Sequence, residues 1–354
     1  MRVALDATPL TLSSGGLRRY VEQLSLALAR EFPEDDYLLL SDQPFHPPAG
    51  SPPNLRPAAG PARPLERRWW LWGSRRAIRR CGAQLFHGTN FETPYLPAAP
   101  SVLTLHDLSP WMDPAWHCDA QRVRRRTPWL IRLGLATMIL TDSQAVRRQA
   151  IERFRIHPER IAAVPLAAPS HFRPVATPPP EKPYLLYVGM LEPRKNLGLL
   201  LEAWRQIRKR HEVDLVLAGR RRRDFPAPAP QPGLHLLDEV PDERLPALYS
   251  AALAFVYPSL YEGFGLPVLE AMQCGAAVIT SRDPALSETA GGAAVQLEAG
   301  DLRAWIEALT QAVTQPEWRA EWRRRGLRRA AEFRWERTAR LTREVYAEAL
   351  RRSG

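Results

Sequence analysis

Short aliphatic runs alternate with longer amphipathic runs along most of the 354 residues, and one proline-rich segment divides this alternation in two. Residues 174–183 hold five prolines, which fix φ and carry no backbone amide, so the segment forms neither a helix nor an inner strand. Alternating strands and helices are typical of βαβ units around a parallel sheet. The sequence therefore predicts an α/β protein with two Rossmann-like domains, residues 1–173 and 184–334, joined by a linker at residues 174–183.

The same periodicity places individual elements in each half. The strands predicted before the linker are Arg2–Leu5, Tyr37–Leu40, Leu85–His87, Val102–Leu105, Met138–Thr141 and Ile161–Val164, with helices at Tyr20–Phe32 and Ser143–Phe154. The strands predicted after it are Tyr184–Val188, Asp214–Ala218, His235–Leu237, Ala254–Tyr257 and Ala277–Thr280, with helices at Leu197–Arg210, Glu243–Ala251 and Pro267–Cys274. Pro44–Pro64 is expected to be a loop. Because open α/β sheets bind ligands beyond the carboxyl ends of their strands, we expect a site there, in a cleft between two facing parallel sheets.

The net charge is +11, and most of it lies in the first half of the chain. Residues 1–175 contain 23 basic and 15 acidic residues, a surplus of +8, whereas residues 176–354 contain 26 and 23, a surplus of +3. Nucleic acid, an anionic membrane surface or phosphate-bearing ligands could each be attracted by this charge. Only three of the 49 basic residues are lysine, which indicates a general bias toward arginine rather than an RNA-binding site.

The cysteines and the N-terminus indicate the compartment. Cys81, Cys118 and Cys274 are far apart and have no metal-binding spacing, which is typical of a reducing cytosol. Asp6 stands where a signal peptide needs an apolar run. The longest apolar stretch, Trp129–Leu140, is too short to cross a bilayer and contains an arginine. We therefore expect a cytoplasmic protein.

The segment Tyr257–Glu270 carries the most specific pattern, in which a predicted strand is followed by a glycine-rich loop and a helix. Four residues precede or begin that helix and are predicted to bind a ligand that carries a diphosphate: Gly263, Phe264, Gly265 and Leu266. Glycines let the backbone approach a ligand, and the amides of a helix N-terminus attract a diphosphate. Glu270 could accept hydrogen bonds from two ribose hydroxyls, and Glu262 could orient sugar hydroxyls. A glycine turn before an amphipathic helix with two solvated acids is the alternative.

Seven residues separate Glu262 from Glu270, and the sequence between them contains Gly-Phe-Gly-Leu-Pro. In this motif the chain resembles the retaining GT-B glycosyltransferases of family 4, and the resemblance covers nearly its whole length. It implies a GT-B fold, in which the first domain binds the acceptor and the second binds a nucleotide-sugar donor. It also implies transfer with retained anomeric configuration, a catalytic role for Glu262, and a final helix within residues 335–354 that packs back on the first domain.

A second segment, Tyr187–Asn196, ends a predicted strand and leads into a predicted helix. It contains Gly189 and then the basic pair Arg194 and Lys195. Cations in this place can neutralise a departing diphosphate, because negative charge grows there in the transition state. We predict both cations as catalytic and donor-binding residues and Gly189 as a donor-binding residue. A basic pair on the surface is the alternative.

His106 and Asp107 follow the predicted strand Val102–Leu105. By the resemblance, His106 is a catalytic residue near the transferred sugar, and Asp107 lies on the acceptor side. A lone histidine at a strand end is more often structural, but the His-Asp pair at a strand end of the domain that should face the donor favours a functional role.

The segment Gly15–Tyr20 lies between the first predicted strand and the first predicted helix. It is similar to the glycine-rich loop that the family directs toward the donor phosphates. The resemblance implies that Gly16 binds the donor and that Arg19 and Tyr20 lie on the acceptor side. Arg18 departs from the pattern, since the family has a small residue there.

The resemblance implies a nucleotide-sugar co-substrate, with no other cofactor and no metal. No Asp-x-Asp motif stands where it could hold a metal and a diphosphate, so Arg194 and Lys195 would do that work. Residues 104–117 look most like bacterial mannosyltransferases that use GDP-mannose in polysaccharide assembly, which favours a mannosyl donor. The acceptor would be a glycan or a lipid-linked acceptor, and no nucleic-acid partner is expected.

The segment Arg67–Arg80 combines arginines with three tryptophans. Such a helix can lie on an anionic membrane with its tryptophans at the interface, which would make the protein a peripheral enzyme on the cytoplasmic face. It can equally be a buried helix with a solvated basic face. The sequence leaves both interpretations open.

Two other functions fit parts of the pattern. An NDP-sugar 2-epimerase has a similar two-domain architecture and donor, and isomerisation of the donor without transfer would identify it. A non-catalytic basic protein would bind nucleic acid or membrane in a salt-sensitive way without affinity for a nucleotide-sugar. The ordered motifs at strand ends favour the glycosyltransferase, because a binding module does not need them.

Overall fold

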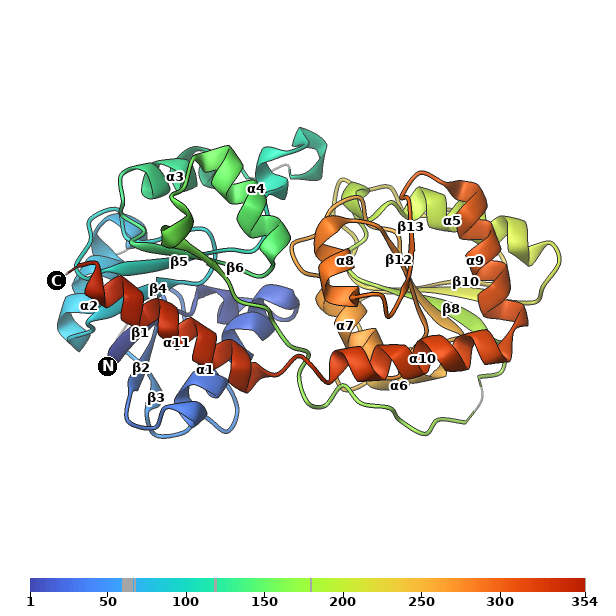
Figure 1. Ribbon diagram of the computed structural model, residues 1–354, viewed down its shortest axis with the longest axis horizontal. Coiled ribbons are helices and arrows are strands. Elements are labelled where there is room, and N and C mark those ends of the chain that lie inside the picture. The colour runs from blue at the N-terminus through green and yellow to red at the C-terminus, as the bar shows by residue number, and fades with distance from the viewer. Residues whose placement is uncertain (59–65, 67, 118–119, 179, 354) are drawn as a thin grey trace. The chain divides into compact units, whose positions relative to one another are not determined.

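The computed structural model describes residues 1–58, 66, 68–117, 120–178 and 180–353 (Figure 1). The chain forms two compact units, of which the first comprises Met1–Leu166 and Arg334–Gly354 and the second Ala167–Phe333. The first unit thus ends before residue 173, where the sequence placed its boundary. Residues 174–183 belong to the second unit and contain no helix or strand at the described positions, whereas Pro179, like Cys118, lies outside the described residues.

The first unit is built on a seven-stranded sheet with the order β3-β2-β1-β4-β5-β6-β7, in which every pairing is parallel. Its strands are β1 (Arg2–Asp6), β2 (Asp36–Leu40), β3 (Leu55–Pro57), β4 (Leu85–Gly88), β5 (Ser101–Leu105), β6 (Met138–Thr141) and β7 (Ile161–Ala163). Its helices are α1 (Gly16–Glu31), α2 (Ser74–Cys81), α3 (Gln121–Arg132), α4 (Gln144–Phe154) and α11 (Trp335–Arg351). The six predicted strands are confirmed, with ends that differ by at most one residue.

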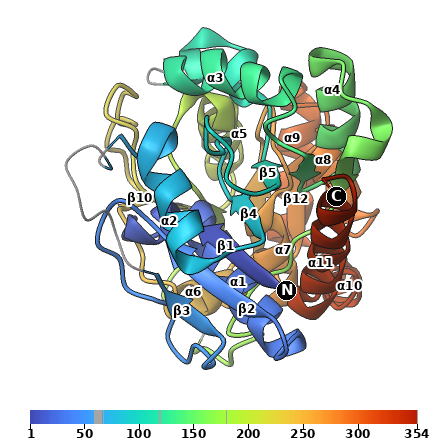
Figure 2. The same cartoon turned by 90° about the vertical axis from the view of Figure 1, so that its left-hand side faces the viewer.

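Strand order decides which face of this sheet each helix covers. The connection from β1 to β2 runs toward one edge of the sheet, whereas those from β3 to β4 and from β5 to β6 run toward the other. Right-handed crossovers then place α1 on one face and both α2 and α3 on the opposite face. Helix α11 lies beside α1 (Figure 2), where Arg340 and Arg343 donate to Glu31 and Asp35 at 2.8 and 2.7 Å. Helices on both faces bury the inner strands β4, β5 and β6 at every residue, whereas the edge strands β3 and β7 are only partly buried.

Strand β3 corrects the prediction of a loop at Pro44–Pro64, of which residues 59–64 lie outside the described residues. It pairs with β2 in a parallel register that sets Pro57 opposite Leu39. A proline has no amide to donate, and it is tolerated here because β3 has a neighbour on one side only. The proline content therefore concealed an edge strand.

The Arg67–Arg80 segment, of which Arg67 lies outside the described residues, is buried in part. A π-helical turn, η3 (Trp69–Gly73), leads into α2. Trp69 and Ile78 are buried in a core cluster with Phe86 of β4. Arg79 and Arg80 are exposed. This burial favours the interpretation as a buried helix with a solvated basic face, whereas membrane contact of the segment, in which Trp72 is 40% exposed, stays a prediction.

The second unit has a six-stranded parallel sheet with the order β10-β9-β8-β11-β12-β13. Its strands are β8 (Tyr184–Val188), β9 (Asp214–Ala218), β10 (Leu234–Leu237), β11 (Ala254–Tyr257), β12 (Val278–Ser281) and β13 (Val295–Leu297). Its helices are α5 (Leu197–Arg208), α6 (Leu245–Ala251), α7 (Leu266–Gln273), α8 (Pro284–Ala290), α9 (Leu302–Thr314) and α10 (Pro316–Ala330). The predicted elements are present, β13, α8 and α9 are additional, and α10 begins the polar stretch from Glu317 to Leu350, whose pattern is also typical of a helix.

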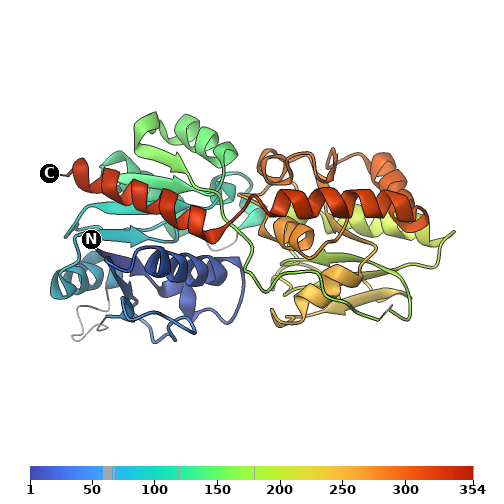
Figure 3. The ribbon, with the colours of Figure 1, turned by 60° about the horizontal axis from the view of Figure 1, so that its bottom comes forward.

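Helices α10 and α11 follow one another along the chain and are separated by residues 331–334 (Figure 3). Helix α10 packs on α7 and α9 in the second unit, whereas α11 packs on α1 and the sheet of the first. The end of the chain thus completes the unit in which the chain began. Within the described residues, no helix combines the length and the hydropathy needed to cross a bilayer.

Candidate active site

The Glu262–Glu270 segment connects β11 to α7, as the sequence predicted. Gly265 is the N-cap of α7 and has a φ of 92°, in the left-handed region. A Cβ atom at this position would lie 2.4 Å from Cδ2 of Leu286, so both the backbone and the packing require glycine. Phe264 is buried, and its carbonyl accepts a hydrogen bond from Oγ1 of Thr289 at 2.6 Å. These contacts with α8 hold the loop in one conformation.

The loop after β8 lies against this segment because β8 and β11 are neighbouring parallel strands. It contains a 3-10 turn, η7 (Pro193–Lys195), and ends at Asn196, the N-cap of α5. The Leu260 amide donates to the Arg194 carbonyl at 2.9 Å, and Nδ2 of Asn196 donates to the Pro258 carbonyl at 3.3 Å. The carboxyl ends of two strands thereby bring the two predicted donor motifs together.

Four charged side chains from these two loops form a buried cluster. The Lys195 Nζ donates to Oε1 of Glu262 at 2.5 Å and to the Tyr257 hydroxyl at 2.7 Å. Arg194 donates to Oε2 of Glu262 at 3.1 Å and to Oε1 of Glu192 at 2.9 Å. Each of the four charged side chains is at most 11% exposed. Two cations and two carboxylates leave this cluster without net charge.

Burial and charge act in opposite directions on this cluster. Burial alone would raise the pKa of the Glu262 carboxyl, but the charges of Lys195 and Arg194 outweigh it and lower that pKa from 4.5 to about 2. Burial and the charge of Arg194 lower the pKa of Lys195, against the opposing pull of Glu262. The carboxylate that links the two cations therefore stays ionised throughout the neutral range.

Acid is expected to remove the stability that Glu262 contributes. Because its pKa is lower in the folded protein, this contribution is present above about pH 4.5 and is lost as the pH falls toward about 2. The shift corresponds to about 3 kcal/mol, at about 1.4 kcal/mol per pKa unit. Urea unfolding of the wild type and of Glu262→Gln, at pH 7 and at pH 3, measures the effect. The free energy of unfolding of the wild type should exceed that of the variant by more at pH 7 than at pH 3. An equal difference at both pH values would contradict the lowered pKa of Glu262.

Glu270 lies one turn into α7, but its carboxylate is turned inward. The residue has no exposed surface, and the Tyr249 hydroxyl donates to its Oε2 at 3.1 Å. Gly263 is buried as well, and Leu266 is half-buried as the first residue of α7. Contact between Glu270 and a ribose therefore stays a prediction, and it needs a rotation of the Glu270 side chain.

Gly189 lies at a close approach of two loops. Its amide donates to the carbonyl of Ala218 at 2.9 Å. A Cβ atom on Gly219 would lie 2.1 Å from the Gly189 carbonyl oxygen, and both glycines have positive φ. The glycine that the sequence assigned to the donor thus also permits packing of the loops after β8 and β9.

In the first unit, both ring nitrogens of His106 are engaged. Nδ1 lies 2.7 Å from Oδ2 of Asp142, and Nε2 lies 2.8 Å from the carbonyl oxygen of Thr89. A carbonyl can only accept, so Nε2 carries a proton. Burial would lower the pKa of His106, but the charge of Asp142 and the hydrogen bonds to Asp142 and Thr89 outweigh it and raise that pKa above 6.5. Both ring nitrogens are therefore occupied, and the raised pKa favours the protonated ring over a free base.

Tyr20 is buried behind His106 rather than open to an acceptor. Its ring meets the His106 ring edge-on, with centroids 4.8 Å apart. Its hydroxyl lies 3.0 Å from Oγ1 of Thr104, which in turn lies 2.7 Å from Nε2 of His87. Nδ1 of His87 lies 2.7 Å from the hydroxyl of Tyr346 in α11. This buried network holds the Tyr20 ring in place against the His106 ring.

The other predicted residues of the first unit lie on two loops. Asp107 is half-buried and accepts hydrogen bonds from the amide and the hydroxyl of Ser109 at 2.9 and 2.6 Å. Gly16 begins α1, and Arg19 is half-buried in its first turn. The departure at Arg18 has a structural use, because its guanidinium donates to the carbonyls that end the preceding 3-10 turn.

Three partners of the predicted residues were missed. Glu192 binds Arg194, Tyr257 binds Lys195, and Asp142 binds His106. Glu192 and Tyr257 stand inside the two donor motifs, so an acid before a basic pair and a tyrosine at a strand end were available signals. Asp142 follows β6, and its position at the carboxyl end of the strand next to β5 was the available signal.

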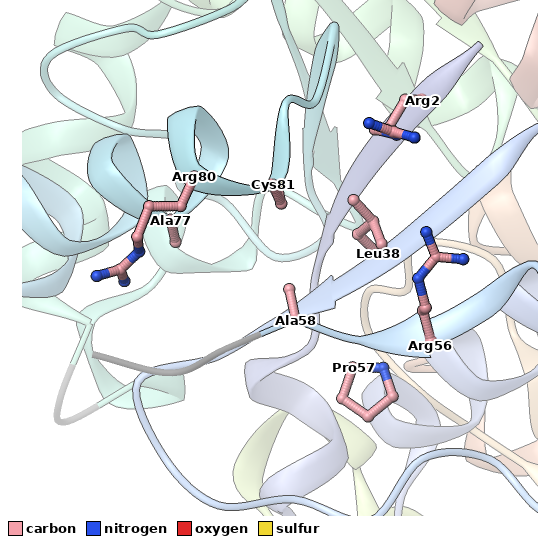
Figure 4. Close-up of a pocket in the computed structure, with 8 residues that line it drawn as sticks. All are labelled: Arg2, Leu38, Arg56, Pro57, Ala58, Ala77, Arg80 and Cys81. Carbon is pink, nitrogen blue, oxygen red and sulfur yellow. The ribbon is translucent and has the colours of Figure 1, made fainter. Parts of the chain in front are cut away.

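A pocket of about 300 Å³ in the first unit lies elsewhere (Figure 4). Its lining includes Arg2, the first residue of β1, together with Arg56, Ala58 and Cys81. It therefore opens near the amino end of β1, whereas the predicted residues follow the carboxyl ends of strands. In the part of the chain that the structure describes, no three His, Cys, Asp or Glu side chains come together as a metal site would require.

Comparison with known proteins gives two family models that together match most of the chain. The model described as Glycosyltransferase Family 4 matches residues 14–170, and the model described as Glycosyl transferases group 1 matches residues 170–329. The chain is 35% identical over 292 residues to the O-antigen chain mannosyltransferase B of Escherichia coli, which covers 76% of either protein. Such a relative supports transfer of a sugar and gives no support to an epimerase or to a non-catalytic binding protein.

Two solved structures share the fold. Sucrose-phosphate synthase from Thermosynechococcus elongatus superposes with a TM-score of 0.76 at 21% identity, over 98% of each chain. HepE from Anabaena, in complex with UDP-glucose, superposes with a TM-score of 0.74 at 15% identity, over 98% of this chain and 99% of HepE. Both likenesses agree with the predicted GT-B fold of two Rossmann-like domains.

Proposed function

The chain belongs to glycosyltransferase family 4, and from this membership we propose that it transfers a mannosyl group from a nucleoside-diphosphate mannose to a hydroxyl of a glycan or lipid-linked acceptor. GDP-mannose is the donor we expect. The sugar, and a role in assembling a bacterial surface polysaccharide, are inferred from the mannosyltransferase of Escherichia coli to which the chain is similar. The two free cysteines of the described residues, Cys81 and Cys274, support the proposal that the enzyme works in the cytoplasm.

The buried cluster of Arg194, Lys195, Glu192 and Glu262 is the observation that carries this proposal. Burying four charges is costly, and a fold that needed only stability would do as well with apolar side chains. The cluster follows the carboxyl ends of β8 and β11, where open α/β sheets bind their ligands. A binding site for a charged leaving group accounts both for the energetic cost of burying these charges and for their position after the two strands.

In the proposed reaction, the bond between the anomeric carbon and the diphosphate oxygen breaks and a bond from that carbon to the acceptor oxygen forms. The proton of the acceptor hydroxyl passes to the departing diphosphate. Arg194 and Lys195 stabilise the negative charge that grows on this diphosphate, which makes a metal unnecessary. Glu262 positions both cations and orients a sugar hydroxyl. We propose that the anomeric configuration is retained.

His106 contributes charge and position rather than proton abstraction. With Nε2 bound to the Thr89 carbonyl and Nδ1 bound to Asp142, the ring is fixed in one orientation. The raised pKa favours a proton on this ring, and a positive charge there favours an anion nearby. The acceptor proton therefore needs another base, and the departing diphosphate supplies one.

GDP and GDP-mannose are expected to raise the thermal stability of the protein more than UDP and UDP-glucose do. A ligand at about 100 times its Kd stabilises the folded state by about 2.7 kcal/mol, which raises the Tm by about 5–10 °C for units of this size. Differential scanning fluorimetry in the presence of EDTA measures the shift and tests the proposed independence from metal. Incubation with radiolabelled GDP-mannose and a mannose-terminated acceptor then measures transfer.

Each outcome of this experiment decides something. A Tm shift with UDP but not with GDP would replace guanine with uracil as the proposed nucleobase of the donor. A shift that EDTA abolishes would contradict metal independence. Failure of every nucleotide and nucleotide-sugar to shift the Tm would overturn the donor site itself.

A further inference from the structure

Helix α3 carries on its outer side the two most exposed large hydrophobic side chains of the described residues. Trp129 is 60% exposed, and Leu133, the C-cap of the helix, is 62% exposed. Side chains of this size favour burial by roughly 1.5–3 kcal/mol each, so their joint exposure points to a binding surface. We propose that Arg125, Trp129, Arg132 and Leu133, which we call the α3 patch, bind the enzyme to the surface of an anionic lipid bilayer.

The outward position of the α3 patch follows from helix geometry. At about 100° per residue, Arg125, Arg132 and Leu133 fall within about 60° of Trp129 around the helix axis. The buried residues of the helix lie on the other side and are Thr127, Leu130 and Ile131. The helix therefore anchors itself in the core by one face and presents an apolar and basic face outward.

The charged side chains of helix α3 itself have one sign. Helix α3 contains five arginines and no acidic residue in its 12 residues. Arg122 pairs with Glu92, and Arg126 donates to the Tyr95 hydroxyl at 2.6 Å. For Arg125 and Arg132, the described part of the chain supplies no acidic partner. Among the described residues, Arg125 and Arg132 thus flank Trp129 without an acidic partner.

An anionic bilayer surface matches both properties of this patch. Tryptophan concentrates at the interface between water and hydrocarbon, and leucine inserts below it. Arginine side chains extend from there toward the lipid phosphates, at about 1 kcal/mol for each charge near an anionic surface. Single-stranded nucleic acid also binds arginines and stacks on tryptophan, but it has no use for a solvent-exposed leucine beside the ring. The combination of opposite charge with two apolar anchors favours lipid.

Helix α3 is also fastened to the loop that carries His106 and Asp107. The guanidinium of Arg124 donates to the carbonyl of Pro110 and, at 3.0 Å, to the carbonyl of His117. A bilayer that holds α3 therefore holds this loop close to its surface, where a lipid-linked acceptor is presented. This consequence rests on the proposed function, whereas the membrane contact itself does not.

The test is co-flotation of the full chain with lipid vesicles, without any nucleotide-sugar. Vesicles of phosphatidylcholine are compared with vesicles that contain about one third phosphatidylglycerol, at low and at high salt. The wild type is expected to bind the anionic vesicles at least 10-fold more tightly, and high salt should release it. Arg125→Glu with Arg132→Glu should weaken this binding by about 30-fold or more, and Trp129→Ala with Leu133→Ala by about 10-fold.

Two matched controls make these losses specific. Trp72→Ala changes a tryptophan of η3 that is 40% exposed, and Arg303→Glu reverses an exposed charge on α9. Both should keep at least half of the wild-type affinity. Failure of the wild type to prefer anionic vesicles, or losses in the controls as large as those in the α3 variants, would overturn the proposal. Binding to single-stranded nucleic acid but not to vesicles would overturn it as well.

The outcome can be separated from that of the proposed function. The α3 variants change exposed side chains, so their Tm and the Tm shift produced by GDP-mannose should match the wild type. Loss of vesicle binding with an intact nucleotide shift confirms the α3 patch. Vesicle binding without any nucleotide shift leaves the α3 patch standing and removes the donor site.

Discussion

Replacing Lys195 with methionine is expected to lower kcat by about 100-fold or more, while the Kd of the donor changes by less than about 10-fold. The ammonium of Lys195 is fixed between Glu262 and the Tyr257 hydroxyl at 2.5 and 2.7 Å. A cation that is already in place stabilises the charge of the departing diphosphate without reorganisation, so its loss falls mainly on the transition state. Steady-state kinetics with GDP-mannose, together with the Kd from calorimetry, separate the two effects.

Methionine is chosen because it keeps most of the apolar stem of the side chain while it removes the charge. Its control is Lys209→Met, the same change on an exposed lysine at the end of α5, which should leave kcat unchanged. Circular dichroism at the assay temperature establishes that both variants are folded. A folded Lys195→Met enzyme with kcat within about threefold of the wild type would refute the role, and an increase in Kd as large as the loss of kcat would reassign Lys195 to ground-state binding.

The inner strands could be predicted from the sequence, and two edge strands could not. Strands such as β5 (Ser101–Leu105) have neighbours on both sides and helices on both faces, so every residue is buried and the run reads as apolar. Strands β3 (Leu55–Pro57) and β13 (Val295–Leu297) each have one neighbour and three residues, of which Arg56 and Gln296 are polar. A run of three residues with mixed polarity is too short to show the two-residue alternation that predicts a strand.

The loops of the site were predictable because glycine and proline specify turns locally, and the partners within the site were not. Gly265 needs a positive φ wherever the rest of the chain lies. By contrast, His106 contacts Asp142, which lies 36 residues further along the chain, and Lys195 contacts Glu262, which lies 67 residues further along. These contacts depend on which strands are neighbours in the sheet, and the packing of the whole sheet sets the strand order. The sequence therefore identified Arg194, Lys195 and Glu262 of the proposed donor site separately, without the contacts that join them.

Replacing Tyr346 with alanine is expected to destabilise the first unit by about 5 kcal/mol and to lower the Tm of its unfolding transition by about 10–15 °C. Tyr346 is fully buried in α11 and, through its hydroxyl, lies 2.7 Å from Nδ1 of His87. Burial and the nearby charge of His106 lower the pKa of His87 to about 3, so this ring is neutral and needs a partner at each nitrogen. The variant leaves a cavity and an unpaired ring nitrogen at the same place. Differential scanning calorimetry measures the loss.

The conservative change Tyr346→Phe separates the two contributions, because it keeps the ring and removes only the hydroxyl. It should cost about 1–3 kcal/mol, the penalty of one unpaired buried polar group, and Arg351→Ala at the exposed end of α11 should cost almost nothing. The hydroxyl begins the network that passes through His87 and Thr104 to Tyr20, whose ring packs on His106. Tyr346→Phe is therefore expected to lower kcat while the Kd of the donor, whose proposed site lies in the other unit, stays constant. Equal Tm values for the wild type and both Tyr346 variants would show that the Tyr346 side chain stabilises the first unit neither by packing nor by its hydrogen bond to His87.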